Sequence, residues 1–228
     1  MPYGCSRCKN ISLIHLFGVD GTGKTTLAYL LEYILKTIFG FKCVVIRKRR
    51  RSPLNDFLVN FLSKLIPEHI IRGGDGRIIR IYGIYKLIWL WLVFQIIGMK
   101  LWYIFRIAIP KMHDCIIILD RYIIDMIVSD TYFFQNINLF KKFLCIYTSV
   151  FRKELLHAHL FHVNASIYTI VKRRGKESDP LNYLVIQGSL FRIIAKIFDV
   201  YEINTDTLTP IKAVMLMLKS IFSEPRTS

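Results

Sequence analysis

Short runs of branched apolar residues recur along the chain, separated by longer stretches with a helical period. The runs lie near residues 12–18, 42–47, 115–119, 159–163 and 200–204. Continuous apolar runs of this length are typical of strands buried on both faces. The intervening stretches, of which residues 24–39 are the clearest, place their apolar residues on one helical face. The alternation predicts an α/β fold in one domain, 1–228, with a five-stranded parallel sheet covered by helices on both faces.

The middle of the chain departs from this alternation. Residues 87–99, LIWLWLVFQIIGM, carry no charge and lie between Lys86 and Lys100, within a helix that we expect over about 78–109. The uncharged run is about 20 Å long as a helix, shorter than the roughly 30 Å of a bilayer core. Because it is apolar almost all round, we expect it to be buried against something. A core helix is favoured over docking on a membrane surface or a partner, and spanning is least favoured.

Composition adds a strong positive charge. Hydrophobic residues make up 53% and charged residues 21% of the 228, which excludes a disordered chain. The net charge is +16, from 32 Lys and Arg against 16 Asp and Glu. Such an excess favours anionic partners, namely nucleotides, nucleic acid or acidic membrane surfaces, without choosing among them.

The cysteines and histidines suggest no metal site. Five scattered cysteines give no disulfide framework, so we expect a reducing, cytoplasmic compartment. Cys5 and Cys8 form one CxxC without the second pair that a zinc site needs, and their role stays open. On a strand, His157 and His159 lie on one face and His162 on the other, which favours core or edge histidines over metal ligands.

The first motif is GVDGTGKTT, residues 18–26, between the first apolar run and the first helical stretch. It fits G-x-x-x-x-G-K-[ST] in full, with strand, loop and helix in the required order. The glycines let backbone N–H groups turn inward, and the helix adds the positive end of its dipole. Lys24 should reach the β- and γ-phosphates of a bound nucleotide, and the Thr25 hydroxyl should hold Mg²⁺. The nucleotide-binding residues predicted here are Gly18, Asp20, Gly21, Thr22, Gly23, Lys24, Thr25 and Thr26.

A second motif is CIIILDRY, residues 115–122, an apolar run that ends in an aspartate. Ligands of open α/β sheets gather at the carboxyl ends of strands, where Asp120 is expected. A carboxylate there can complete the Mg²⁺ shell begun by Thr25. The Arg121 guanidinium suits a bidentate phosphate contact. An Asp–Arg pair that caps a helix is the structural alternative.

A third motif is IVKRRGKESDP, residues 170–180, whose cations surround Gly175. We expect a basic lid near 172–180 that closes over the phosphates, excludes water and stabilises the transferring group. A solvated run of charges is the alternative. The candidate catalytic cations of the chain are Lys24, Arg121, Arg173, Arg174 and Lys176.

The three motifs occur in the same order in thymidylate kinases, which the chain resembles from about 12 to 222 as a divergent member. Residues 179–206 are similar to the family's last long helix and final strand. The resemblance implies a three-layer P-loop fold and transfer of the γ-phosphate of ATP to dTMP with Mg²⁺. It further implies that Asp20 helps hold the acceptor sugar, that Arg121 binds the acceptor phosphate and that the lid supplies the catalytic cation. Family members are commonly homodimers.

The sequence departs from the family pattern in two places. These departures bear on recognition of thymine, so phosphoryl transfer is better supported than dTMP as the acceptor. Asp125 stands where the family often has a serine, and the glutamine expected nearby is missing. The family's R-E-P-G after the second strand is replaced by a basic run, in which Arg47 at the strand end is still expected to meet the acceptor phosphate. One alternative is a P-loop kinase with another acceptor. The other is a nucleotide-binding basic protein that docks on nucleic acid or on a membrane, and neither of these two partners is favoured.

Overall fold

The computed structural model describes residues 13–47, 56–57, 60–61, 70–72, 78–81, 88–111, 114–134, 137–175 and 178–223. Five strands form a parallel sheet in the order β2-β5-β1-β6-β7. They are β1 (Leu13–Phe17), β2 (Cys43–Arg47), β5 (Ile116–Asp120), β6 (Ala158–Asn164) and β7 (Tyr201–Asn204). The predicted five-stranded parallel sheet is therefore confirmed, with each predicted strand overlapping an observed one.

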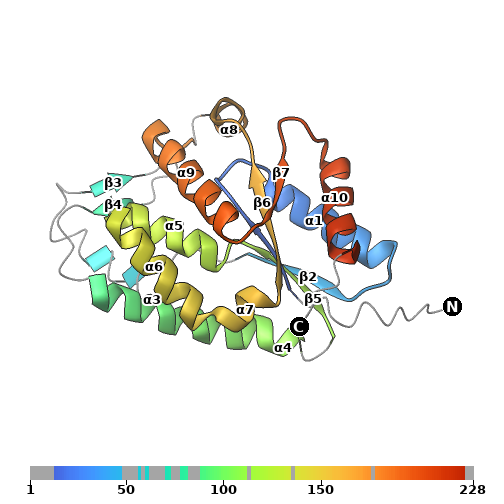
Figure 1. The fold of residues 1–228 in the computed structure, drawn as a ribbon, viewed down its shortest axis with the longest axis horizontal. Coiled ribbons are helices and arrows are strands. Elements are labelled where there is room, and N and C mark those ends of the chain that lie inside the picture. The colour runs from blue at the N-terminus through green and yellow to red at the C-terminus, as the bar shows by residue number, and fades with distance from the viewer. Residues whose placement is uncertain are drawn as a thin grey trace.

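Helices cover both faces of this sheet (Figure 1). One face carries α1 (Lys24–Thr37) and α10 (Pro210–Ser223), which pack on Ile14 and Leu16 of β1. The other face carries α5 (Ile123–Phe134), α6 (Ile137–Val150) and α9 (Leu181–Ile197), with α7 (Arg152–Leu156) beside them. Leu13 and Phe17 of β1 point to this second core because alternate side chains of a strand face opposite ways. The expected three-layer α/β architecture is present.

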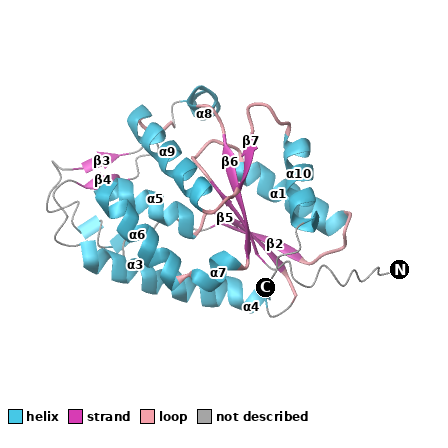
Figure 2. Cartoon of the chain, in the orientation of Figure 1, coloured by secondary structure: helices cyan, strands magenta, loops and turns pink. Residues whose placement is uncertain are grey.

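The region before the apolar helix differs from the expectation of one helix over 78–109. Ile70–Arg72 (β3) and Ile78–Ile81 (β4) pair as a small antiparallel hairpin, drawn apart from the main sheet in Figure 2. The described helix begins at Ile88, so its predicted start at 78 is wrong. It continues as α3 (Ile88–Tyr103), a π-helical segment η4 (Ile104–Ala108) and α4 (Ile109–Lys111).

The apolar helix is buried on one side only. Trp91 is 1% exposed and stacks on Phe133 of α5, with ring centroids 4.5 Å apart. Trp89 and Phe105, by contrast, are 60% and 66% exposed. The expectation that the helix is buried against another part of the chain is therefore confirmed, but only one side is buried, because a single neighbouring layer covers only one face of a helix. By length and composition alone, the segment Ile88–Ala108 also passes as a candidate membrane span, with a mean hydropathy of 1.6.

Candidate phosphate-binding site

The glycine loop joins the end of β1 to the start of α1, and two of its glycines are required by close neighbours. Gly18 has φ +144°, and a Cβ there would lie 2.1 Å from the carbonyl oxygen of Val163 on β6. Gly21 has φ +96°, and a Cβ there would lie 3.1 Å from the Arg174 side chain and from Ile170. Strand β6 and helix α8 (Ile167–Arg174) therefore approach the loop so closely at these two positions that a side chain there would crowd them.

Lys24 lies inside the loop that precedes it. Its side chain is 4% exposed, and Nζ donates to the carbonyl oxygens of Gly18 and Val19, both at 2.7 Å. Nζ also lies 3.7 Å from Asp20 Oδ1. Burial lowers the pKa of Lys24, and the negative charge of Asp20 opposes that effect. A buried ammonium that is held by neutral carbonyls is stabilised in its charged form by a further anion, and a phosphate oxygen would supply that negative charge.

Thr25 and Asp120 meet at the carboxyl end of the sheet. Thr25 Oγ1 donates to Asp120 Oδ2 at 2.6 Å, and Arg47 Nε lies 3.6 Å from the same oxygen. Asp120 is fully buried, and its Oδ1 has no hydrogen-bond partner within the described part of the chain. The strand register explains this meeting, since Asp120 pairs with Leu16 on β1 and with Arg47 on β2. The structure thus brings together the two predicted metal ligands and Arg47.

Asp20 and Arg121 form an ion pair, with 2.5 Å between Oδ1 and Nη2. Both side chains are at least nine-tenths buried. Arg121 has φ +72°, an uncommon conformation for a residue with a Cβ, and it directly follows β5. Such strain is typical of functional sites, where surrounding structure enforces it. The two residues that the sequence assigned to the acceptor nucleotide are therefore direct partners.

Arg173, on α8 at the start of the segment predicted to form a lid, contacts the glycine loop. Its Nη1 lies 3.4 Å from the carbonyl oxygens of Gly21 and Thr22, and Nη1 and Nη2 donate to Thr205 Oγ1 and O at 3.0 Å. Thr205 Oγ1 in turn donates to the Thr22 carbonyl at 2.8 Å. The sequence gives no sign of this bridge, because it depends on where the loop after β7 crosses the glycine loop.

The other lid cations behave differently. Arg174 Nη1 donates to Asp179 Oδ2 at 2.8 Å, and Asp179 is 3% exposed. Gly175 caps α8 with φ +54°. Lys176, like Cys5 and Cys8, lies outside the described residues. Thr26 is exposed on the first turn of α1, on a different side from buried Lys24.

Asp125, the residue in place of the family's serine, stabilises the start of α5. Its Oδ2 accepts a hydrogen bond from the Tyr122 backbone N–H at 3.2 Å and lies 3.5 Å from His15 Nε2. A side chain at the third helical position that reaches back to the cap N–H is half of a capping box. This role was not predicted from the sequence, in which an acidic residue three positions after Tyr122 is the available signal.

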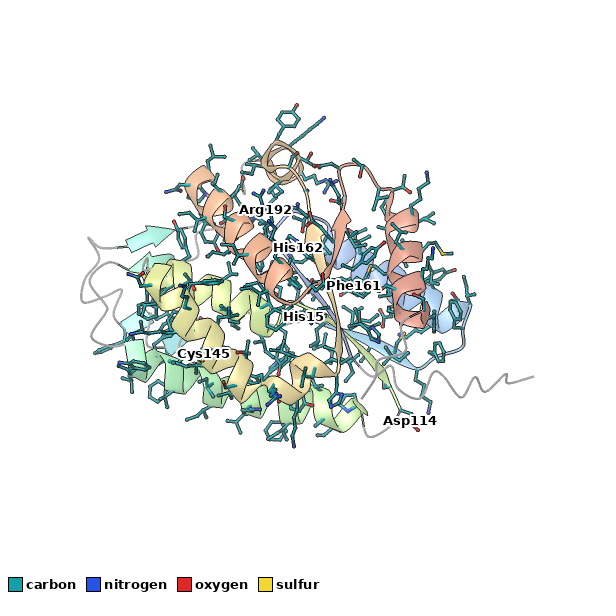
Figure 3. All side chains as sticks on the ribbon, viewed as in Figure 1. His15, Asp114, Cys145, Phe161, His162 and Arg192 are labelled. Atoms are coloured by element: carbon teal, nitrogen blue, oxygen red, sulfur yellow. The ribbon has the colours of Figure 1, made fainter. Side chains whose placement is uncertain are left out.

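The three histidines do not form a metal site. His157 lies in the turn before β6, so its predicted place on the strand is wrong, while His159 and His162 lie on β6 with opposite parity. His162 stacks on Phe17, with ring centroids 5.2 Å apart, and faces the α9 side of the sheet (Figure 3). Among the described residues, no group of three or more His, Cys, Asp or Glu gathers to hold a metal ion.

The fold and the loop define a class of protein. A parallel sheet with a G-x-x-x-x-G-K-T loop after its central strand, and an aspartate at the end of the adjacent strand, is the arrangement of P-loop nucleotide-binding proteins. No known family model matches the sequence, and no curated protein is significantly similar to it.

Comparison with solved structures is more specific. The chain is similar to thymidylate kinase from Ehrlichia chaffeensis, with 22% identity, a TM-score of 0.55 and coverage of 94% of this chain and 99% of that one. It is also similar to thymidylate kinase from Candida albicans, with 17% identity, a TM-score of 0.56 and coverage of 93% and 91%. At these identities the similarity establishes the fold. The resemblance inferred from the sequence is therefore confirmed as a thymidylate kinase-like fold.

Proposed function

We propose that the protein is a nucleoside monophosphate kinase that transfers the γ-phosphoryl group of ATP to an acceptor phosphate, with dTMP as the favoured acceptor. The observation that carries the proposal is the contact between Thr25 and Asp120 beside the buried Lys24. It places a hydroxyl, a carboxylate and an ammonium around the loop where phosphates of P-loop enzymes bind. The shared fold of thymidylate kinases supports dTMP as the acceptor.

The residues at the end of β5 fit Mg²⁺. The ion prefers oxygen ligands and usually takes one or two from protein, with waters and phosphates supplying the others. Asp120 Oδ1 is buried without a hydrogen-bond partner among the described residues, so it is free to accept from a ligand or from metal-bound water. Thr25 and Asp120 would hold the ion, which would neutralise charge on the phosphates.

Phosphoryl transfer requires that donor and acceptor are held in position and that positive charge stabilises the transferring group. An oxygen of the acceptor phosphate forms a bond to the γ-phosphorus, and the bond from that phosphorus to the β–γ bridging oxygen breaks. Lys24 would bind the β- and γ-phosphates. Arg173, which contacts the loop carbonyls, would be the lid cation that stabilises the transferring group, and Arg174 and Lys176 remain further candidates.

The acceptor would lie on the other side of the loop. Arg121 would bind the acceptor phosphate and Asp20 would position its sugar, with the ion pair between them fixing both side chains. Arg47 has an exposed side chain beside Asp120 and would add a second cation. Because bidentate arginine contacts match phosphate geometry, these two guanidiniums favour a phosphorylated acceptor over a free nucleoside.

A panel of acceptors tests the proposal. Purified protein with ATP and Mg²⁺ is offered each of the common nucleoside and deoxynucleoside monophosphates, and ADP formation is measured, with Lys24→Ala as the inactive control. Fastest turnover with dTMP supports the full proposal. The Candida albicans enzyme is described as having broad substrate specificity, so turnover with several acceptors would retain the kinase assignment. Absence of turnover with every acceptor, together with tight binding of polyanions, would reject it.

A further inference from the structure

The turn between β7 and α10, residues 205–209, contacts both ends of α8. At the start of the helix, Asp206 Oδ2 accepts a hydrogen bond from the backbone N–H of Ser166, the N-cap residue, at 2.6 Å. At its end, Thr205 accepts two hydrogen bonds from the Arg173 guanidinium, both at 3.0 Å. Figure 1 shows α8 at the upper margin of the molecule, after the end of β6. Two consecutive residues of the turn therefore hold the helix that carries Arg173.

The Thr205 hydroxyl links the guanidinium to the glycine loop. Its Oγ1 accepts from Arg173 Nη1 and donates to the carbonyl oxygen of Thr22 at 2.8 Å. A hydroxyl has one proton to donate and two lone pairs, so Thr205 can serve both neighbours at once. Hydrogen bonds in such a chain strengthen one another, because each polarises the next. Arg173 is thereby connected to a loop residue that is fully buried.

The hydroxyl is not needed to join the turn to the sheet. The backbone N–H of Thr205 donates to the carbonyl oxygen of Asn164 on β6 at 2.9 Å, next to the last paired residues of β6 and β7. This bond depends on the main chain, so it does not require a threonine. Oγ1 also lies 3.3 Å from that carbonyl oxygen, but its shorter contacts are with Thr22 and Arg173. The side chain therefore mainly serves the glycine loop and α8.

Arg173 lies over the glycine loop and keeps a donor for a ligand. Its Nη1 is 3.4 Å from the carbonyl oxygens of Gly21 and Thr22, and 4.0 Å from the position that a Cβ on Gly23 would take. These contacts and those with Thr205 involve Nη1 and Nη2, while Nε takes part in none of them. All three nitrogens of a guanidinium carry N–H donors. Nε can therefore donate to a phosphate oxygen while Thr205 still holds the other two nitrogens.

We propose that Thr205 is a positioning residue, which holds the Arg173 guanidinium over the glycine loop before the nucleotide binds. The inference rests on the proposed phosphoryl transfer, in which Arg173 stabilises the transferring group. An arginine side chain has many rotamers, and ordering it during folding leaves less entropy to lose when the substrate binds. Support from neighbouring hydrogen bonds also keeps the charged group where negative charge develops in the reaction.

Removal of the hydroxyl tests the proposal. Thr205→Val keeps the shape of the side chain and the backbone bond to Asn164, and it should lower kcat about ten-fold because the guanidinium is less often in position. The KM for the acceptor should stay within about two-fold of the wild-type value, since Arg121 and Arg47 are proposed to bind the acceptor phosphate. Loss of kcat without loss of acceptor binding is the result expected of a residue that acts through the lid arginine.

Control variants separate this role from a purely structural one. Thr205→Ser keeps the hydroxyl and should retain most of the wild-type kcat. Thr207→Val makes the same change two residues further along the turn, where the hydroxyl is 3.4 Å from the carbonyl oxygen of Asn204, and should keep the wild-type kcat. Because Arg173→Ala removes the positioned group, adding Thr205→Val to it should cause no further loss of kcat. Thermal unfolding checks that every variant is folded.

The position of Arg173 can also be measured without any reaction. In the nucleotide-free protein, hydrogen bonds slow the rotation of the guanidinium, so nitrogen NMR should give separate Nη signals for Arg173. The loss of these signals in Arg173→Ala assigns them. Thr205→Val should merge them, because rotation becomes fast, and Thr207→Val should leave them unchanged.

Three kinetic results would overturn the proposal: wild-type kcat in Thr205→Val, an equal loss of kcat in Thr207→Val, or a further loss when Thr205→Val is added to Arg173→Ala. If the wild type turns over no acceptor, the proposed function fails and the Arg173 signals alone decide the positioning role. A change of these signals in Thr205→Val but not in Thr207→Val supports that role, and unchanged signals in Thr205→Val reject it.

Discussion

The Thr25 hydroxyl is hydrogen-bonded to Asp120 at 2.6 Å although the two residues are 95 positions apart in the chain. The parallel pairing of β1 with β5 produces this contact, since it brings the start of α1 and the end of β5 to the same edge of the sheet. One strand supplies the phosphate loop and its neighbour supplies the carboxylate. The site is therefore a consequence of strand order, and its chemistry can be tested one residue at a time.

Asp120→Asn should separate charge from shape at this contact. The amide is almost isosteric and can still accept a hydrogen bond from Thr25, so we expect the free energy of unfolding to change by about 1 kcal/mol or less. Turnover of ATP with Mg²⁺ should fall about 100-fold or more because the carboxylate that would hold the metal is lost. ADP release measured over a range of Mg²⁺ concentrations checks this. Thr25→Ser, which keeps the hydroxyl, should retain most of the activity, and wild-type turnover by the Asp120 variant would contradict the assignment.

Gly18→Ala should lower the free energy of unfolding more than Gly40→Ala does. Both glycines have positive φ, which strains any residue with a Cβ; the conformational cost to alanine is about 1 kcal/mol at Gly40 (φ +70°) and larger at Gly18 (φ +144°). Only at Gly18 would the new Cβ collide with backbone, 2.1 Å from the Val163 carbonyl, whereas at Gly40 nothing lies within 4 Å. We expect an additional loss of about 2 kcal/mol or more for Gly18→Ala. Urea unfolding of the two variants measures the difference, and equal destabilisation would show that β1 and β6 are not packed as described.

Arg173→Ala should slow phosphoryl transfer more than it lowers stability. The guanidinium is exposed and spans the glycine loop and Thr205, so its removal should cost about 1 kcal/mol of folding free energy. If it stabilises the transferring group, kcat should fall about 100-fold. Lys172→Ala, at the exposed preceding position of the same helix, is the matched control and should keep wild-type kcat. Equal kcat in the two variants would transfer the catalytic role to Arg174 or Lys176.

The sheet and the loop were predictable because their signals are local. A strand that is buried on both faces is a continuous apolar run, so it can be recognised from the sequence alone. G-x-x-x-x-G-K-T is a contiguous motif whose geometry depends on glycine. The predicted partnership of Thr25 with Asp120 followed from one topological rule about the ends of parallel strands. These parts of the site needed no knowledge of side-chain packing.

The features that sequence did not predict arise from contacts between distant segments. Thr205 bridges Arg173 to the glycine loop only because the turn after β7 passes over Thr22. The side of α3 that is exposed depends on which side of the helix meets α5, and a helix that is apolar almost all round gives no preferred side. Strand β4 of the small β3–β4 hairpin occupies residues 78–81, which were predicted to begin a helix, because tertiary context decided the conformation.

Acid should destabilise the protein partly through His162. Its side chain is 2% exposed, and burial lowers the pKa of His162, more than the attraction of Glu202 raises it. As the pH falls below about 6.5, the unfolded chain binds a proton at this histidine before the folded chain does, so the free energy of unfolding decreases. His162→Gln removes this contribution and should flatten the pH dependence below pH 6.5 by at most about 1.4 kcal/mol per unit. Urea unfolding between neutral and mildly acidic pH measures the slopes. A His162 variant with the wild-type slope would show that this imidazole binds a proton as readily in the folded chain as in the unfolded one.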